Sequence, residues 1–281
     1  MASPAHGETT GPGQPKIILH WLEVSRAHRI LFLFEELGVP YELKTYKRTK
    51  ERLAPPELKD VHPLGKSPVV TIETPGSTTP IVLAESAAIA EYFCDYYGKG
   101  TSLVPSRYQE GKDGQIGAET ESWLRYRMFM HYAEGSLMPF MVLSLIVGSE
   151  YFQVSRRRHQ ALTKSAIRNA PVPFFIKPIT NSVAGKIESS YLQRNMKSHY
   201  DFLEAQLATS PDGGDYLCGK DITAADIMLL FPLEAGQTRS GFTQSQYPKI
   251  WAYVERLHER DAYKRAVAKV VEIEGEFKTT L

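Results

Sequence analysis

The order of secondary-structure patterns along the chain constrains its fold more than any other feature. Residues 16–22, "KIILHWL", form a compact apolar run that is typical of a buried strand. The next segment, "SRAHRILFLFEELGV", repeats apolar side chains at helical spacing, with Ser25 as a candidate N-cap and Gly38 as a candidate C-cap. The other elements expected before residue 99 are strands at 41–47, 69–73 and 81–83 and a helix at 85–98.

This order predicts a mixed sheet. A strand–helix–strand unit should cross over in the right-handed sense and leave its two strands parallel. The turn-rich "TPGSTTP" between the last two strands should join them as an antiparallel hairpin. Four strands with helices on the faces of the sheet form a thioredoxin-like α/β domain, which we place at residues 16–98.

Beyond residue 98 only helical patterns follow. The glycine-rich, polar stretch at residues 99–114 is typical of a linker. Helical patterns are found at residues 115–147, 183–207, 223–235 and 247–271. The sequence "TAAD" at Thr223–Asp226 matches a capping box in which Asp takes the usual place of Glu. We therefore expect an all-α helical bundle domain at residues 115–281.

Composition and charge argue against several classes of protein. The 281 residues are 42% hydrophobic and 23% charged, which is typical of a globular protein. Lysine and arginine number 33 against 32 acidic residues, and the resulting net charge of +1 gives no support for nucleic acid or an anionic membrane as a partner. Residues 1–15 lack the apolar core of a signal peptide, so we expect a disordered arm there.

Membrane insertion and metal binding find no support either. No apolar run reaches the ~18 residues of a membrane span. The longest candidate, Leu137–Val147, contains Pro139, and we expect it to be a buried helix. The two cysteines, Cys94 and Cys218, do not have the spacing of a metal site. Isolated cysteines favour a reducing compartment, so we expect a cytoplasmic protein.

One short motif points to chemistry. In "HPLGKSPVV", Pro68 directly precedes the apolar strand that starts at Val69. A proline cannot donate to a sheet ladder, so it belongs at the first residue of a strand or on an edge. The motif is either a plain turn or a place where neighbouring backbone groups are left free to bind a ligand.

This motif, followed by "ESAAIAEYF" and "LCGKDITAADI", resembles the cytosolic glutathione transferases. The similarity runs from about Lys16 to the C-terminus and is greatest to the fungal and bacterial branch related to the yeast transferases and the nitrogen-regulator-like proteins. It implies an enzyme that conjugates the thiolate of glutathione to hydrophobic electrophiles, and it allows glutathione peroxidase activity. It also implies a homodimer, with glutathione as co-substrate, no further cofactor and no metal.

The resemblance implies a glutathione site in the first domain. The bond before Pro68 would be cis, and the backbone groups of Ser67 would bind the cysteinyl part of glutathione. Ser86 would donate to the γ-glutamyl carboxylate at a helix start, where backbone N–H groups attract an anion. Glu85 would pair with the ammonium group. The alternative for Glu85 and Ser86 is that they only cap their helix.

Three further residues complete the expected site. Lys66 would face the glycine carboxylate, with Arg52 as a helper. Ser25 stands at the helix start where redox members of this fold carry a cysteine, and its O–H can donate to the thiolate of glutathione. The alternative role of Ser25 is a simple N-cap. Tyrosine activation, used by other branches, has no candidate, since Trp21 occupies that strand.

The electrophile should bind between the domains, facing Ser25. The residues expected to contribute from the first long helix are Trp123, Tyr126, Arg127, Met130 and His131. Arg26, His28 and Arg29 are expected at the surface or between the domains, without a catalytic role. Two other functions stay open at this point: a non-catalytic glutathione-fold regulatory or binding protein, and a glutathione-dependent thiol reductase. The absence of a cysteine near Ser25 argues against the reductase.

Overall fold

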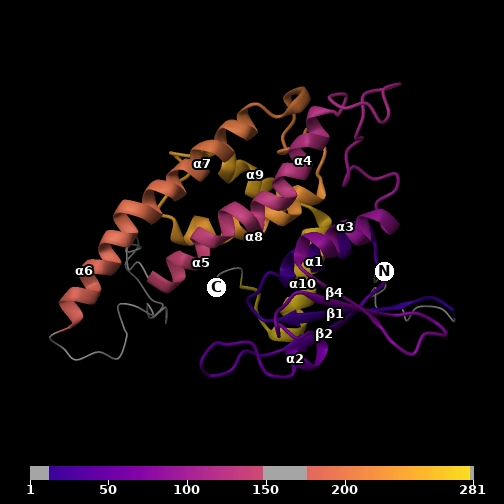
Figure 1. Ribbon diagram of the computed structural model, residues 1–281, viewed down its shortest axis with the longest axis horizontal. Helices are drawn as coiled ribbons and strands as arrows, with labels where there is room; N and C mark the ends of the chain where they lie inside the picture. Colours follow the sequence, from indigo (N-terminus) through magenta and orange to yellow (C-terminus); the bar gives the residue numbers. More distant parts are fainter. Residues whose placement is uncertain (1–12, 148–175, 279–281) are drawn as a thin grey trace, which may run out of the picture.

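The computed structural model describes residues 13–147 and 176–278, which form a small sheet with helices beside a larger set of helices (Figure 1). The expected arm at residues 1–15 lies outside the described residues except for its last three. Arg156–Arg158, which the sequence places on a solvated helix face rather than in a binding patch, lie outside them too. The domain boundaries at residues 98 and 114 stay predictions. Among the described residues, every strand lies before residue 98 and every long helix of the second part begins after residue 114.

The sheet has four strands in the order β2-β1-β3-β4. Their bounds are Lys16–Leu22 for β1, Glu42–Tyr46 for β2, Val69–Glu73 for β3 and Ile81–Ala84 for β4. β1 pairs with β2 in parallel, whereas β3 pairs antiparallel with β1 on one side and with β4 on the other. The mixed sheet expected from the sequence is therefore confirmed.

Two long helices and one short helix accompany the sheet. α1 (Ala27–Leu37) is buried over most of its length and packs on β1, on α3 (Ser86–Tyr97) and on helices of the second part of the chain. Gly38 ends α1 with a left-handed φ of 66°, as expected of a C-cap glycine. The short α2 (Leu58–Val61) places Leu58 against Leu22 and Tyr46.

The second part of the chain is helical. Its first segments are α4 (Glu121–Tyr132), the π-helix η1 (Ala133–Leu137) and α5 (Met138–Val147). They are followed by α6 (Lys177–Ile187), the π-helix η2 (Glu188–Leu192), α7 (Gln193–Ala208) and the 3₁₀ turn η3 (Pro211–Gly213). The last are α8 (Ala224–Arg239), α9 (Pro248–His258) and α10 (Asp261–Glu274). None of the helices among residues 13–147 and 176–278 is long and apolar enough to cross a membrane.

Several helix boundaries differ from the sequence-based prediction. The pattern expected at residues 183–207 begins at Lys177 and is interrupted by η2, and α8 extends to Arg239. The pattern that begins at residue 115 forms a helix only from Glu121, because Thr120 caps the helix by accepting the N–H of Trp123 at 3.1 Å. The pattern at residues 247–271 is two helices instead of one. The chain turns at Arg260, whose ψ of 136° is extended and cannot continue a helix.

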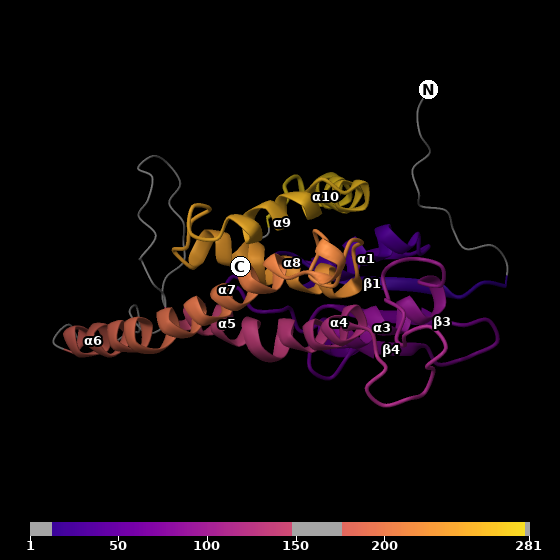
Figure 2. The same ribbon diagram turned by 90° about the horizontal axis from the view of Figure 1, so that it is seen from above.

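The core of the second part is α8. Figure 2 shows α8 between α9 and α10 on one side and α4 and α5 on the other. The capping box predicted at its start is present: Asp226 accepts the backbone N–H of Thr223 at 2.7 Å and the Tyr253 hydroxyl at 2.8 Å, in a fully buried position. This start fixes where α8 enters the core and therefore which side chains it presents to α1 and α4.

The last helix packs back onto the first domain. α10 lies along α1, where Arg260 pairs with Glu36 and Arg265 donates to Glu35 at 2.9 Å. At its end the indole N–H of Trp21 in β1 donates to Glu274 at 2.9 Å. The two parts of the chain are thus joined by the C-terminal helix as well as by α8.

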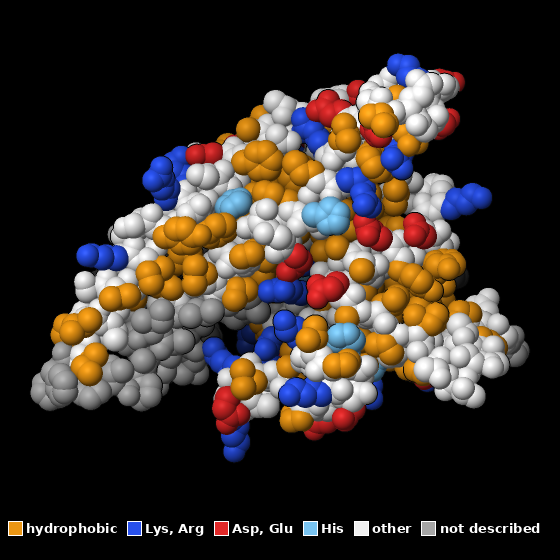
Figure 3. Space-filling model, in the orientation of Figure 1, with side chains coloured by type: hydrophobic (Ala, Val, Ile, Leu, Met, Phe, Trp, Pro, Cys, Tyr) orange, Lys and Arg blue, Asp and Glu red, His pale blue; other side chains and the backbone are white. Residues whose placement is uncertain are grey.

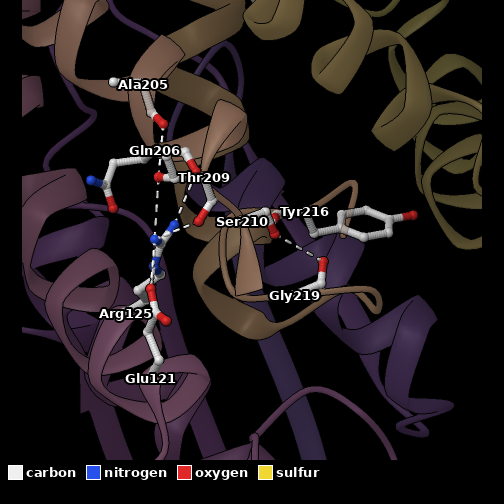
Figure 4. Close-up of polar contacts among 8 residues, drawn as sticks. All are labelled: Glu121, Arg125, Ala205, Gln206, Thr209, Ser210, Tyr216 and Gly219. Carbon is white, nitrogen blue, oxygen red and sulfur yellow. Dashed lines mark hydrogen bonds and ion pairs between the residues drawn. The ribbon is translucent and has the colours of Figure 1, made fainter. Parts of the chain in front are cut away.

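One arginine ties α4 to the end of α7 (Figure 4). The guanidinium of Arg125 donates to the carbonyl oxygens of Gln206 at 2.9 Å and Thr209 at 2.6 Å, and Glu121 accepts two further N–H groups. The last carbonyls of a helix have no partner within the helix, so Arg125 satisfies acceptors that α7 leaves free. Just beyond, Ser210 donates to the carbonyl of Tyr216 at 2.5 Å and holds the following turn.

Replacing Arg125 by alanine should lower the free energy of unfolding by about 2–3 kcal/mol, because hydrogen bonds from a charged donor are lost at a mostly covered site. Denaturant unfolding of the two proteins measures the difference. Arg127→Ala is the matched control on the same helix. The ion pair between Arg127 and Glu91 is more exposed, so losing it should lower the free energy of unfolding by less than about 1 kcal/mol. Equal losses in both variants would contradict this account of Arg125.

Candidate functional site

Three chain segments meet at one end of the sheet. In the β3–β4 register Val69 lies opposite Ala84, so the residues just outside, Ser67 and Glu85, lie at the same end. Leu22, the last residue of β1, donates its N–H to Ser67 Oγ at 3.3 Å. The starts of α1 and α3 lie at this end as well, because each follows shortly after the strand that precedes it.

Ser67 is held from β1. Its hydroxyl donates to the carbonyl of His20 at 2.8 Å, and the Ser67–Pro68 bond is cis, as the family resemblance implied. Within the described part of the chain, the backbone N–H and C=O of Ser67 have no hydrogen-bond partner. Both groups are therefore free to bind the backbone of an extended ligand.

A neutral histidine supports this segment from behind. The His20 ring lies 2.8 Å from the Tyr46 hydroxyl through Nδ1 and 3.1 Å from Thr71 Oγ1 through Nε2. Burial, aided by the charge of Lys44, lowers the pKa of His20 to about 4. Both partners are hydroxyls that can donate or accept, so the neutral ring is satisfied and keeps the end of β1 in place.

Glu85 and Ser86 form the opposite wall. Glu85 is exposed and has no ion-pair partner in the ranges that the structure describes, whereas Ser86 is buried as the first residue of α3. The backbone of Glu85 has φ 68° and ψ 115°, a conformation that residues with a Cβ rarely adopt. Strained backbone of this kind is held by its surroundings and is common at binding sites.

The loop before α1 is also strained. Val24, a β-branched residue, has a φ of 47°. Arg48 holds the loop by donating from Nε to the carbonyl of Glu23 at 3.1 Å and from Nη2 to that of Val24 at 2.9 Å. Ser25 follows, and its Oγ accepts the N–H of Ala27 at 3.2 Å. The N-cap of α1 is Arg26, one residue after the position predicted from the sequence, and it makes no side-chain cap. Ser25 binds the N–H of the first helical residue through its Oγ, and its own O–H is left to donate elsewhere.

The two basic residues expected in the site differ in position. Lys66 is exposed beside Ser67, and its amino group has no ion-pair partner among the residues of known placement. Arg52 is exposed in the loop after β2, where its carbonyl accepts from Arg48 at 3.0 Å. Arg48 was not among the residues expected in the site. Its partners lie 24 and 25 residues away, and no local pattern marks such contacts.

The expected electrophile residues on α4 do not share one surface. Tyr126 and Met130 are core residues with 2% and 0% of their surface exposed, so they do not line an open cleft. Trp123 lies between two arginines, with its ring centroid 4.7 Å from Arg107 and 5.8 Å from Arg127. His131 is exposed. The helical spacing of Tyr126 and Met130 is therefore that of residues facing the core.

A second group missed by the sequence analysis connects the site to the helical part. Glu134, in η1, accepts N–H groups from Arg26, directly before α1, and from Arg29 within α1. Arg29 is fully buried and also approaches Ser86 Oγ at 3.4 Å. Arg29 and His28 are thus residues between the domains, one of the two positions expected for them. Arg29 and Glu134 are 105 residues apart in sequence, so no motif pairs them.

The end of the sheet thus combines free backbone groups, two helix starts, a free carboxylate and a free amine. Helix N-termini favour anions, Glu85 suits a cation, and the backbone of Ser67 suits an extended peptide. No group of three or more side chains suited to a metal ion is found in the part of the chain that the structure describes. The arrangement suits a small peptide that carries both charges, and the fold is that of a two-domain protein with a thioredoxin-like first domain.

Comparison with known proteins identifies the family. Residues 25–95 match the model of the glutathione S-transferase N-terminal domain, and residues 164–261 match that of the C-terminal domain. Glutathione S-transferase 3 of Schizosaccharomyces pombe is 32% identical over 90% of this chain and 88% of its own length. Glutathione S-transferase 1 of Saccharomyces cerevisiae is 29% identical over 91% of this chain and 95% of its own. The chain belongs to the glutathione S-transferase family.

Solved structures agree with this fold. A glutathione S-transferase from Actinobacillus pleuropneumoniae has a TM-score of 0.63 and 26% identity, and the match covers 90% of this chain and 92% of that one. A glutathione transferase from Phanerochaete chrysosporium, solved with oxidized glutathione, has a TM-score of 0.61 at 17% identity, covering 95% and 100% of the two chains. The family and the thioredoxin-like plus helical architecture expected from the sequence are both confirmed.

The strain at Glu85 makes a prediction about stability. Glu85→Gly should be more stable than Glu85→Ala by about 1 kcal/mol, because only alanine keeps a Cβ at a φ of 68°. Ala88→Gly, at an exposed position inside α3, is the control and should lose about 1 kcal/mol, the ordinary effect of glycine in a helix. Thermal or denaturant unfolding measures all three. An Ala variant at position 85 as stable as the Gly variant would argue against strain there.

Proposed function

We propose that this glutathione transferase adds the thiolate of glutathione to hydrophobic electrophiles at the end of the sheet, with Ser25 as the residue that activates the thiol. The observation that carries the proposal is the meeting of Ser25, the free backbone of Ser67 and the unpaired Glu85 beside two helix starts. In this arrangement the Ser67 backbone binds the cysteinyl part, Ser86 donates to the γ-glutamyl carboxylate and Glu85 pairs with the ammonium. Lys66 is the candidate partner of the glycine carboxylate.

The free energy needed to lower the pKa of the glutathione thiol is within what Ser25 and the start of α1 can supply. A free thiol has a pKa of ~8.5, so only a few per cent is thiolate at neutral pH. Lowering that pKa by ~2 units requires about 2.7 kcal/mol. One hydrogen bond from Ser25 to the charged sulfur supplies about 1.5–3 kcal/mol, and the start of α1 adds up to about 1 kcal/mol. Ser25 is 6% exposed, so a thiolate that reaches it is removed from water, which strengthens the bond.

The cysteines support a transferase over a thiol reductase. Cys94 and Cys218 are both buried and free. Burial, with the nearby charges of Asp95 and Glu91, raises the pKa of the Cys94 thiol to about 12, and burial raises that of Cys218 as well. Neither is a thiolate nucleophile at neutral pH. Reduced, separated cysteines also support the proposed cytoplasmic location.

A conjugation assay with glutathione and an aryl halide or an isothiocyanate tests the function itself. Glutathione-dependent product formation is the expected result. Calorimetry with glutathione is run on the same preparation. Binding without conjugation of any electrophile would favour a regulatory or binding protein, and the absence of binding would reject the site.

Ser25→Ala should raise the pKa of the bound glutathione thiol by about one unit or more and lower turnover by about 10²-fold. Affinity for glutathione should change little, because Ser67, Glu85 and Ser86 hold the rest of the molecule. The thiolate absorbance of bound glutathione, followed against pH, measures the shift. Ser25→Thr keeps the hydroxyl and its hydrogen bond to the Ala27 N–H and should retain most activity. Matching titration curves for wild type and Ser25→Ala would leave Ser25 with the hydrogen bond to Ala27 alone.

The protein is also proposed to form a homodimer through the surface of β4, α3 and α4. Figure 2 shows these elements together, on the side away from α9 and α10. Their exposed apolar side chains are Ile81, Val82, Tyr96, Leu124 and Met128. Figure 3 shows apolar side chains gathered on the face of the molecule around α4. β4 is an edge strand, and an uncovered apolar edge favours association. Twofold pairing is the commonest closed symmetry.

Light scattering at micromolar concentration should therefore give a mass near twice the chain mass of 31.6 kDa. Leu124→Glu should shift the protein toward the monomer, since it places a charge in the apolar surface. Val271→Glu, at an exposed position on α10, is the control and should leave the mass unchanged. A wild-type mass near 31.6 kDa would contradict the dimer.

A further inference from the structure

A buried guanidinium lies directly behind the site. Arg29 is on α1 with none of its surface exposed, and its Nη1 donates to Glu134 of the π-helix η1. The same nitrogen lies 3.4 Å from Ser86 Oγ at the start of α3. On another side the guanidinium carbon lies 5.4 Å from the ring centroid of Phe231 in α8. One side chain therefore contacts both parts of the chain at the residue proposed to bind the γ-glutamyl carboxylate.

Burying this cation lowers the stability of the folded protein. Removing a cation from water is compensated only partly by the hydrogen-bonded carboxylate of Glu134, the weaker attraction of the Glu234 carboxylate and one aromatic face. The Nε and Nη2 groups of Arg29 have no hydrogen-bond partner within residues 13–147 and 176–278. Burial, opposed mainly by Glu134, lowers the pKa of Arg29. An apolar side chain of similar size would fill this space at lower cost, so stability does not account for an arginine here.

The contact with Ser86 supplies a functional reason for an arginine at this position. When Ser86 Oγ accepts an N–H from Arg29, the remaining O–H of the serine is directed away from the guanidinium. A hydroxyl that accepts from a cation is also a stronger donor, because neighbouring hydrogen bonds polarise one another. Ser86 is thereby oriented and strengthened as a donor to an anion at the start of α3.

Glu134 fixes the guanidinium from the helical part. It accepts from Arg29 and, at 2.8 Å, from Arg26, which directly precedes α1 and follows Ser25. The carboxylate stands in the π-helix Ala133–Leu137, between α4 and α5. A π-turn contains one residue more than an α-turn and displaces side chains from their regular positions, and such turns are frequent at functional sites.

We infer that Arg29, held by Glu134, is a positioning residue that orients Ser86 toward the α-carboxylate of the γ-glutamyl group. The inference rests on the proposed function and extends it. It assigns selectivity for that carboxylate to a contact between the domains. Arg29 does not touch glutathione in this account, and it acts through Ser86 alone.

The test compares glutathione with 4-aminobutanoyl-cysteinylglycine, which lacks only the α-carboxylate of the γ-glutamyl group. Binding of each peptide to the full-length protein is measured by calorimetry or by competition, and KM and kcat are measured with the same electrophile. Arg29→Met should weaken glutathione binding and raise its KM by roughly tenfold, the loss of about one oriented hydrogen bond. kcat at saturating glutathione should stay within about twofold, since Ser25 is unchanged. The preference for glutathione over the analogue should fall by the same factor.

Two further variants and one control separate positioning from folding. Arg29→Lys keeps a cation beside Glu134 but has no planar fork to span Glu134 and Ser86, so it should fold and still lose the preference. In a Ser86→Ala background, Arg29→Met should have no further effect on the preference. Arg125→Ala, destabilised at a distant place, should keep the wild-type preference. A general loss of stability therefore does not mimic the expected result.

The outcomes are distinct. If the wild type does not bind glutathione, the proposed function fails. If the wild type binds and conjugates glutathione but Arg29→Met and Arg29→Lys keep its preference over the analogue, the positioning role is overturned and the function stands. The role is overturned as well if the two changes at positions 29 and 86 are additive. Should Arg29→Met not fold, Arg29→Lys and its combination with Ser86→Ala decide the question.

Discussion

The pairing of β3 with a strand on each side is the interaction on which the rest of the structure depends. Because strand side chains alternate between faces, a shift by one residue would exchange the two faces of β3 and turn Thr71 away from His20. It would also separate Ser67 from Leu22 and from Glu85, which the present register brings to one end. The pairing that closes the core is therefore the same pairing that assembles the candidate site.

Much of the strained backbone lies apart from the well-packed segments of the structure. The sheet interior and most of α8 are apolar, and the capping box at Asp226 is fully satisfied by hydrogen bonds. Strained backbone at Val24 and Glu85 and the incompletely paired buried charge of Arg29 lie at the end of the sheet that faces η1, whereas Arg52 and Asp212, which also have a positive φ, lie in the loops after β2 and α7. The stable part holds the unfavourable features in place, which is how a preorganised binding site is maintained.

The sequence was sufficient for those features that depend on neighbours along the chain. Strand and helix periodicity predicted the mixed sheet, Gly38 predicted the end of α1, and "TAAD" predicted the start of α8. It was insufficient where contacts between segments far apart in the sequence determine the structure. The turn at Arg260 splits one continuous helical pattern, and Tyr126 and Met130 became core because α8 covers that face of α4. The pairs made by Arg48 and by Arg29 join segments that no local pattern connects.

The position of α10 has a consequence for the order in which the protein can form during synthesis. The ribosome releases the first domain well before α10, yet one side of α1 is covered by α10, and the indole N–H of Trp21 donates to Glu274 at the end of α10. Domains commonly fold one after another from the N-terminus as they emerge. In this chain the first domain emerges with an uncovered apolar helix face, and α10 can close that face only after it has left the ribosome in turn. During synthesis α1 therefore depends on α10, more than 200 residues further along the chain, for protection from aggregation.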